Sequence, residues 1–190
     1  MTERFNHIAG LSASELLNEV ELTEPPFDPF DVASRLFITV DEKIDLDRMS
    51  ISGEIGLDES REPIIWINPL DPPNRRRFTM AHELGHLVND ILPHISQEGV
   101  DDKFSDPEMN LRRDGRQDPR EFAANEFAAD LLMPKEHIIQ QAKKIINAYQ
   151  KEKGEESKMP VTSFIAGLTS IFEVSQVAMD IRLKRMNIIK

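Results

Sequence analysis

Two histidines and a glutamate occur in the order His-Glu-x-x-His, at His82, Glu83 and His86. In a helix, residues four positions apart lie one turn apart on the same face, so the two imidazoles could bind one metal ion. Glu83 is rotated away from them, where its carboxylate could reach a water bound to that metal. This is the pattern of zinc metallopeptidases, and it predicts a zinc (Zn2+) site with Glu83 as the catalytic base.

The segment 75–90, which carries this motif, has the periodicity of an embedded helix. Its apolar residues form two stripes that together cover about half of the helix circumference. They are Met80, Leu84, Leu87 and Ile91 on one stripe and Phe78, Ala81, Gly85 and Val88 on the other. His82 and His86 fall in the polar strip that remains. The pattern therefore favours a ligand-bearing helix over the competing interpretation, a chance match in a core helix.

A catalytic zinc typically has three protein ligands and one open position for water, so a third ligand must come from elsewhere. The position six residues after the second histidine, where a metzincin has its third histidine, is Leu92. Glu121 is the best candidate because it opens the next predicted helix. The competing interpretation is that Glu121 and Asp118 form a capping-box start that needs no metal. His94 and His137 remain alternative ligands.

Two further roles around this site stay open in the sequence. Asn125 lies four residues after Glu121 on the same helix face, and its amide could accept the outer N–H of a zinc-bound histidine. A tetrahedral oxyanion would need a second donor besides zinc, which His94, Tyr149 or an arginine of the preceding loop could supply.

The composition excludes several classes of protein and site. A chain of 190 residues suits one domain with a small appendage, and the absence of cysteine excludes disulfides and thiolate ligands. The formal charge is 23 − 34 = −11, which repels phosphate backbones, so direct nucleic-acid binding is not expected. The first residues lack signal-peptide features and no apolar stretch approaches membrane-spanning length, so we expect a cytoplasmic protein without a membrane segment.

The predicted fold is α+β, with a small, mostly antiparallel sheet packed against the metal-binding helix and further helices toward the C-terminus. The β-rich segments are 37–40, 49–55 and 63–68. One helix is predicted at 12–21, and a second begins after a cap at Asp28 or Asp31. A third runs from 118 to a stop at Pro134, a fourth begins at Lys135, and two short helices are predicted within 161–190. We predict a metallopeptidase domain at 1–150, a charged linker at 151–160 and a small helical segment at 161–190.

Two segments beside the motif carry further expectations. Arg75, Arg76 and Arg77 stand at the positive end of the predicted helix, so acidic partners should compensate them. The segment 91–118 loses periodicity and carries many charges, which predicts a long loop of about 28 residues. Such a loop is expected to be either a lid or a disordered excursion.

Several of these segments resemble the ImmA/IrrE family of metallopeptidases. The resemblance rests on R-R-R-F-T-M-A-H-E-L-G-H, on E-F-A-A-N-E-F-A-A-D-L-L-M-P at 121–134, and on F-D-P-F-D-V-A and I-I-W-I-N upstream. It covers roughly residues 27–134. Relatives commonly have a further histidine shortly after the motif, where this chain has Asn89 and Asp90.

The resemblance implies a zincin-like, gluzincin-type fold in the cytoplasm of a bacterium or on a mobile element. It implies His82, His86 and Glu121 as zinc ligands and Glu83 as the base. It also implies a substrate class, a helix-turn-helix transcriptional repressor whose cleavage switches on stress-response or mobile-element genes.

The segment 168–183 resembles a helix-turn-helix in which Ser175 caps the second helix. The turn position usually held by glycine is Glu173, which suits a left-handed backbone less well. The only basic residues nearby are Arg182, Lys184, Arg185 and Lys190, fewer than a DNA-reading face normally has. A structural or partner-docking role is therefore favoured over DNA reading.

The function predicted first is a zinc-dependent endopeptidase of regulatory specificity that acts on a protein substrate. The alternative is a non-hydrolytic regulator that binds a repressor or DNA and uses the zincin fold as a scaffold. Glu83 favours the enzyme, because a scaffold has no need of the catalytic base. A purely structural metal site is disfavoured because two histidines and one carboxylate leave a coordination position open.

Overall fold

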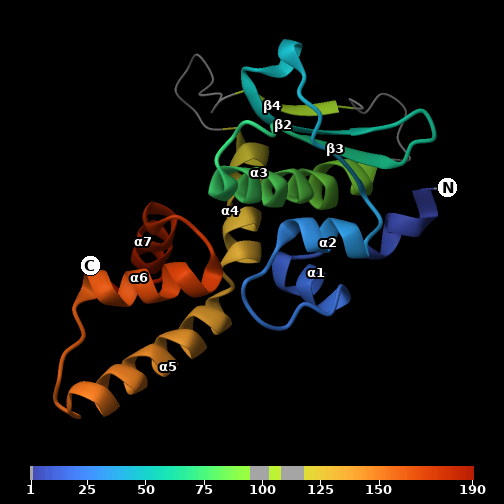
Figure 1. Ribbon diagram of the computed structural model, residues 1–190. Coiled ribbons are helices and arrows are strands. Elements are labelled where there is room, and N and C mark those ends of the chain that lie inside the picture. The colour runs from blue at the N-terminus through green and yellow to red at the C-terminus, as the bar shows by residue number, and fades with distance from the viewer. Residues whose placement is uncertain (1, 95–102, 108–117) are drawn as a thin grey trace. The chain divides into compact units, whose positions relative to one another are not determined.

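The computed structural model describes residues 2–94, 103–107 and 118–190 (Figure 1). These residues form two compact units. The first comprises the described residues within 2–23 and 28–131, and the second comprises Glu24–Phe27 and Leu132–Lys190. The predicted domain limits at 1–150, 151–160 and 161–190 remain a prediction.

A four-stranded mixed sheet lies in the first unit. Its strands are β1 (Thr39–Asp41), β2 (Ile51–Leu57), β3 (Pro63–Ile67) and β4 (Lys103–Pro107), in the spatial order β1-β3-β2-β4. β2 runs antiparallel to β3 and β4, whereas β1 pairs with β3 in parallel. Two of the three pairings are antiparallel, which agrees with the prediction of a mostly antiparallel sheet, and β1 is the parallel exception.

The segment 91–118, predicted as one long loop, contains regular structure. The helix after the motif continues through the π-helical turn η3 (Leu87–Ile91) and the 3₁₀ turn η4 (Leu92–His94), and β4 then pairs with β2. The prediction of a single loop is therefore wrong, because backbone pairing forms an edge strand where side-chain periodicity is weak. Most of the segment 91–118 predicted as a lid, namely 95–102 and 108–117, lies outside the described residues.

The first unit contains further helical elements, several of which begin at a side-chain cap. They are η1 (Thr2–Ile8), α1 (Ala13–Glu19), α2 (Pro29–Arg35), η2 (Leu46–Arg48), α3 (Pro73–His86) and α4 (Pro119–Leu132). Ser12 and Glu15 form a capping box at α1, and the Asp28 side chain accepts a hydrogen bond from Phe30 N at α2. α3 packs on β2, β3 and α2, so the helix that carries the motif lies against the sheet (Figure 1).

The three arginines at the start of α3 have acidic partners, as predicted from the helix dipole. Arg75 Nε lies 3.4 Å from Asp71 Oδ2 and donates to Ser52 Oγ at 2.8 Å. Arg76 pairs with Glu42, and Arg77 lies 3.4 Å from Asp28 Oδ2. These contacts join the start of α3 to the start of α2 and to the sheet, which supports a structural role for the arginines.

Trp66 belongs to the core of the sheet. Its side chain is buried on β3, and its indole Nε1 donates to the carbonyl oxygen of Lys43 at 3.0 Å. This is the role of a core aromatic residue of the sheet.

The second unit consists of α5 (Lys135–Lys153), α6 (Val161–Phe172) and α7 (Gln176–Arg185). α6 packs against both α5 and α7. Ser175 caps α7 by accepting a hydrogen bond from Ala178 N, and Glu173 ends α6 in the left-handed conformation with a φ of 51°. The two short helices predicted within 161–190 and the Ser175 cap are confirmed.

In the part of the chain that the structure describes, no single helix is long and apolar enough to cross a membrane. Helices α6 and α7, which are bent by 108° at the break between them, are together long and apolar enough for a broken membrane span or a re-entrant loop, by length and composition alone.

Candidate metal centre

His82 and His86 project from one face of α3, one turn apart, as their spacing predicted. Both are buried, with relative exposures of 3% and 2%, and their Nε2 atoms lie 3.0 Å apart. The rings meet edge to face, with centroids 4.6 Å apart. Packing therefore fixes the two imidazoles with one nitrogen of each directed at the other.

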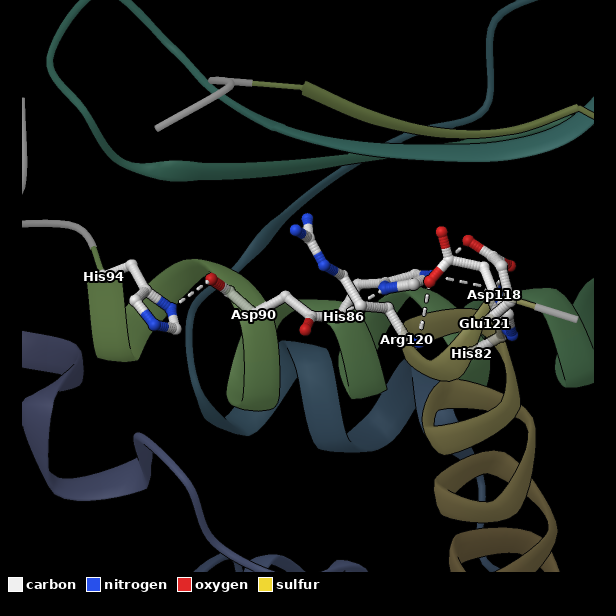
Figure 2. Close-up of polar contacts among 7 residues, drawn as sticks. All are labelled: His82, His86, Asp90, His94, Asp118, Arg120 and Glu121. Atoms are coloured by element: carbon white, nitrogen blue, oxygen red, sulfur yellow. Dashed lines mark hydrogen bonds and ion pairs between the residues drawn. The ribbon is translucent and has the colours of Figure 1, made fainter. Parts of the chain in front are cut away.

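Glu121 at the start of α4 completes the group (Figure 2). Its Oε2 lies 3.3 Å from His82 Nε2, and its Oε1 lies 3.3 Å from His86 Nε2. The start of α4 is capped by Asp118, whose Oδ1 accepts a hydrogen bond from Arg120 N at 3.0 Å. The carboxylate of Glu121 faces both histidines, so the structure brings together the three residues that were predicted as ligands.

Gly85 explains how α4 comes close enough to deliver this carboxylate. A β-carbon placed on Gly85 would lie 3.2 Å from Ala124 Cα and 3.2 Å from Phe127 Cβ, both on α4. These contacts are tighter than nine in ten contacts of real β-carbons, and one of them is to backbone. The glycine inside the motif thus sets the separation between α3 and α4, and with it the reach of Glu121.

The contacts of this group shift the pKa values of His86 and Glu121 in opposite directions. Burial alone would lower the pKa of His86, but hydrogen bonds with Asp90 and Glu121 and the negative charges of Glu83 and Glu121 raise it to about 9. Hydrogen bonds with His82 and His86 lower the pKa of Glu121 well below its usual range. In the metal-free site, the positive charge of protonated His86 therefore balances the negative charge of Glu121, as a bound cation would.

The donor set fits zinc in kind and in spacing. Two zinc–nitrogen bonds of ~2.05 Å at the tetrahedral angle place their nitrogens about 3.3 Å apart. The Nε2 separation of 3.0 Å and the two nitrogen–oxygen separations of 3.3 Å are close to this value. The ligand atoms of His82, His86 and Glu121 all lie within 4.8 Å of one another. Three such ligands leave the fourth position open for a water or a substrate oxygen.

Glu83 lies on α3 beside the ligands and is completely buried. Its carboxylate packs under β2, where Gly53 leaves room for it. A β-carbon on Gly53 would lie 3.0 Å from Glu83 Oε1 and would clash with Thr79 Cγ2. Sequence reasoning missed Gly53, although a glycine inside a strand pattern is a known signal of a close approach between backbones.

Asp90 is a second residue of the site that sequence reasoning missed. Its Oδ2 lies 2.7 Å from His86 Nδ1, the position for which Asn125 was predicted. Among the described residues, no hydrogen bond joins Asn125 to either histidine. The spacing of four residues between His86 and Asp90 on a continuous helical segment was the signal that could have identified it.

The other candidate donors lie outside the group. His94 is exposed, and its Nδ1 lies 3.0 Å from the backbone oxygen of Asp90. His137 and Tyr149 lie on α5 in the second unit, and the His137 ring packs edge to face against Phe27. Within the described residues, the only histidines of the metal-binding group are therefore His82 and His86.

Comparison with known proteins points to the same site. The chain matches the model of the M78 peptidase family, described as IrrE N-terminal-like domain, over residues 35–184, which include all the site residues. It is also similar to the radiation response metalloprotease IrrE of Deinococcus radiodurans, with 32% identity over 97 residues. That alignment covers 51% of this chain and 27% of the relative, so the chain matches about a quarter of the relative's length.

Proposed function

This chain belongs to the M78 peptidase family, with an IrrE N-terminal-like domain, and we propose that it is a zinc-dependent endopeptidase that cleaves a protein substrate. The observation that carries the proposal is the convergence of His82, His86 and Glu121 beside the buried Glu83. Zinc-dependent hydrolysis requires ligands such as two imidazoles and one carboxylate, together with a second carboxylate nearby that can act as the base. The family match over residues 35–184 and the geometry of this donor set support the same conclusion.

In the proposed mechanism, His82, His86 and Glu121 hold the ion through two nitrogens and a carboxylate. Zinc, when bound, supplies Lewis acidity toward the scissile carbonyl and toward the attacking water. Glu83 takes the proton of that water and passes it to the leaving amine, a role worth roughly 10²–10⁴-fold in rate. Burial of Glu83 under β2 keeps its carboxylate in one place for both transfers.

The fold supports the same assignment. α3 carries the motif beneath a small mixed sheet, and α4 supplies the third ligand from its first turn. We assign this arrangement to the zincin-like class, of the type whose third ligand is a glutamate. The assignment rests on the positions of the ligands and on the family match.

For the substrate we propose a helix-turn-helix transcriptional repressor, cleaved in the cytoplasm to switch on stress-response or mobile-element genes. The support is the resemblance of the motifs to the ImmA/IrrE family. The relative from Deinococcus radiodurans is itself named a radiation response metalloprotease. An enzyme with such a role acts on few proteins, so its substrate should be identifiable among the soluble proteins of its own cells.

The test compares the zinc-loaded wild type with the Glu83→Gln variant on those soluble proteins. New N-termini are labelled and identified by mass spectrometry, and zinc content is measured in parallel. We expect the wild type to create a new N-terminus in a helix-turn-helix protein, and Glu83→Gln to lose at least ~10²-fold in cleavage rate while it keeps its zinc. A variant that still cuts would remove Glu83 as the base, and cleavage only of other proteins would remove the repressor.

A further inference from the structure

The outer ring nitrogens of the two histidines have different surroundings. His86 Nδ1 lies 2.7 Å from Asp90 Oδ2, and both side chains are largely buried. His82 Nδ1 is also buried but has no hydrogen-bond partner among the residues that the structure describes. The inner nitrogens of both rings are directed at each other and at Glu121. One of the two imidazoles is thus oriented from behind by a carboxylate.

We propose that Asp90 is a positioning residue of the metal site, which accepts the Nδ1–H of His86 and so leaves His86 Nε2 as the metal-binding nitrogen. The inference rests on the proposed zinc site and adds to it a residue outside the ligand set. A neutral imidazole carries one proton, and the partner of one nitrogen decides which nitrogen remains free to bind a metal. A carboxylate also makes the free nitrogen a stronger ligand.

The local backbone holds Asp90 in place independently of α4. Asp90 lies in the π-helical turn η3, where Leu92 N donates to Leu87 O, and π turns are frequent at functional sites. The backbone oxygen of Asp90 faces His94 Nδ1 at 3.0 Å (Figure 2). Because His86 and Asp90 belong to one continuous helical segment, His86 is oriented even before Glu121 is considered.

This placement predicts a graded response to substitution. Asp90→Ala removes both the orienting contact and the negative charge, and loss of such an outer partner typically costs 10–100-fold in metal affinity. Asp90→Asn keeps an oxygen that can accept the Nδ1–H but removes the charge, so its affinity should lie between those of the wild type and Asp90→Ala. Asn89→Ala is the matched control, because Asn89 lies in the same turn with similar partial burial.

The experiment measures zinc affinity of the full chain by competition with a chelator at fixed pH, for the wild type and the three variants. In the zinc-loaded wild type, nitrogen NMR of the histidines reports which ring nitrogen of His86 carries the proton. We expect the order wild type, Asp90→Asn, Asp90→Ala, with a loss of roughly 10–100-fold for the last. Asn89→Ala should bind like the wild type, and the His86 proton should be on Nδ1.

Two results would overturn the positioning role while leaving the enzyme in place. One is wild-type zinc affinity in Asp90→Ala, and the other is a zinc-loaded wild type whose His86 proton lies on Nε2. The NMR result on the wild type and the near-isosteric Asp90→Asn decide the question even if Asp90→Ala does not fold. A wild type that binds no zinc would contradict the proposed function itself, and the role of Asp90 with it.

Discussion

Glu83 and Glu121 are two carboxylates of one site in very different surroundings. Glu121 is partly exposed at the start of α4, and its contacts with His82 and His86 keep its pKa well below the usual range. It is therefore ionised whenever a cation arrives, as a metal ligand must be. Glu83 is enclosed between α3 and β2, with Gly53 directly above its carboxylate. Enclosure suits the proton transfer that we propose for Glu83, because the carboxylate is shielded from solvent.

Removal of Glu121 should empty the metal site. Glu121→Ala deletes the only carboxylate of the described metal-binding group, so zinc retained after extensive dialysis should fall from about one ion per chain to well below half. Elemental analysis of the purified proteins measures this directly. Glu126→Ala, five residues later on a different face of α4, is the matched control and should keep its zinc. Unchanged zinc in Glu121→Ala would transfer the third-ligand role to another residue.

The protonation of His86 predicts how the stability of the metal-free protein depends on pH. Its pKa is about 9 in the folded chain, against an ordinary value of 6.5, because the contacts with Asp90 and Glu121 outweigh burial. Because folding raises this pKa, protonation of His86 contributes its full stabilisation of the folded state below pH 6.5. That contribution is lost as the pH rises through about 9. The urea midpoint in the presence of a chelator should therefore fall between pH 6.5 and pH 9.

The zinc-loaded protein serves as the control for this pH series. A bound ion requires His86 to be deprotonated, so the decline over the same range should disappear or reverse. A urea midpoint of the metal-free protein that stays constant or rises from pH 6.5 to pH 9 would show that His86 does not gain its proton affinity on folding.

At the scale of elements, the site depends on the distance between α3 and α4. Both candidate ligand histidines come from α3, and the candidate carboxylate ligand comes from the first turn of α4. Gly85 permits the close approach, since a β-carbon there would meet the backbone of Ala124 and the ring of Phe127. Backbone atoms cannot yield as the end of a flexible side chain can, so α4 itself would have to move.

Gly85→Ala and Gly167→Ala should therefore have opposite effects. In Gly167→Ala the nearest atom is Ile145 Cδ1, also at 3.2 Å, which can move, and alanine favours a helix over glycine by about 1 kcal/mol. Gly85→Ala should lose roughly 1–3 kcal/mol through overpacking and should bind zinc more weakly as Glu121 is displaced. Thermal unfolding and chelator competition on both variants measure the two effects. Wild-type zinc affinity in Gly85→Ala would show that α4 adjusts without moving Glu121.

Local sequence signals, such as helical spacing and caps, predicted much of this arrangement. They did not predict the pairings between strands that are distant in the sequence. The helical spacing of His82 and His86 and the cap at Ser175 are set by neighbours a few residues away, and both were predicted correctly. The parallel pairing of β1 with β3 depends on register between separate segments, and periodicity alone does not distinguish it from antiparallel pairing. β4 was missed for the same reason, because its pairing with β2 is a backbone interaction.

At the scale of the whole chain, charge and the surface of α7 argue together against DNA reading. The formal net charge is −11, which opposes the approach of a phosphate backbone. Arg182 is buried, with its Nε donating to the backbone oxygen of Met133, and Lys184 pairs with Asp180 at 2.7 Å. Beside the exposed Lys184 and Arg185, α7 also exposes the apolar Val177 and Ile181, which are 69% and 49% exposed. A face of this kind suits contact with protein better than contact with phosphate.

We therefore predict that the full chain does not bind duplex DNA at physiological salt. Non-specific DNA binders have dissociation constants of roughly 10⁻⁴–10⁻⁶ M under these conditions, and this chain should show no saturation up to about 10⁻⁴ M. Fluorescence anisotropy of a labelled duplex at two salt concentrations measures it, with the Lys184→Glu/Arg185→Glu variant as the control. Micromolar binding that weakens with salt and disappears in that variant would assign α7 to DNA, because only phosphate contacts produce that dependence. Equal, salt-insensitive anisotropy in both proteins would leave α7 as a surface for protein contacts.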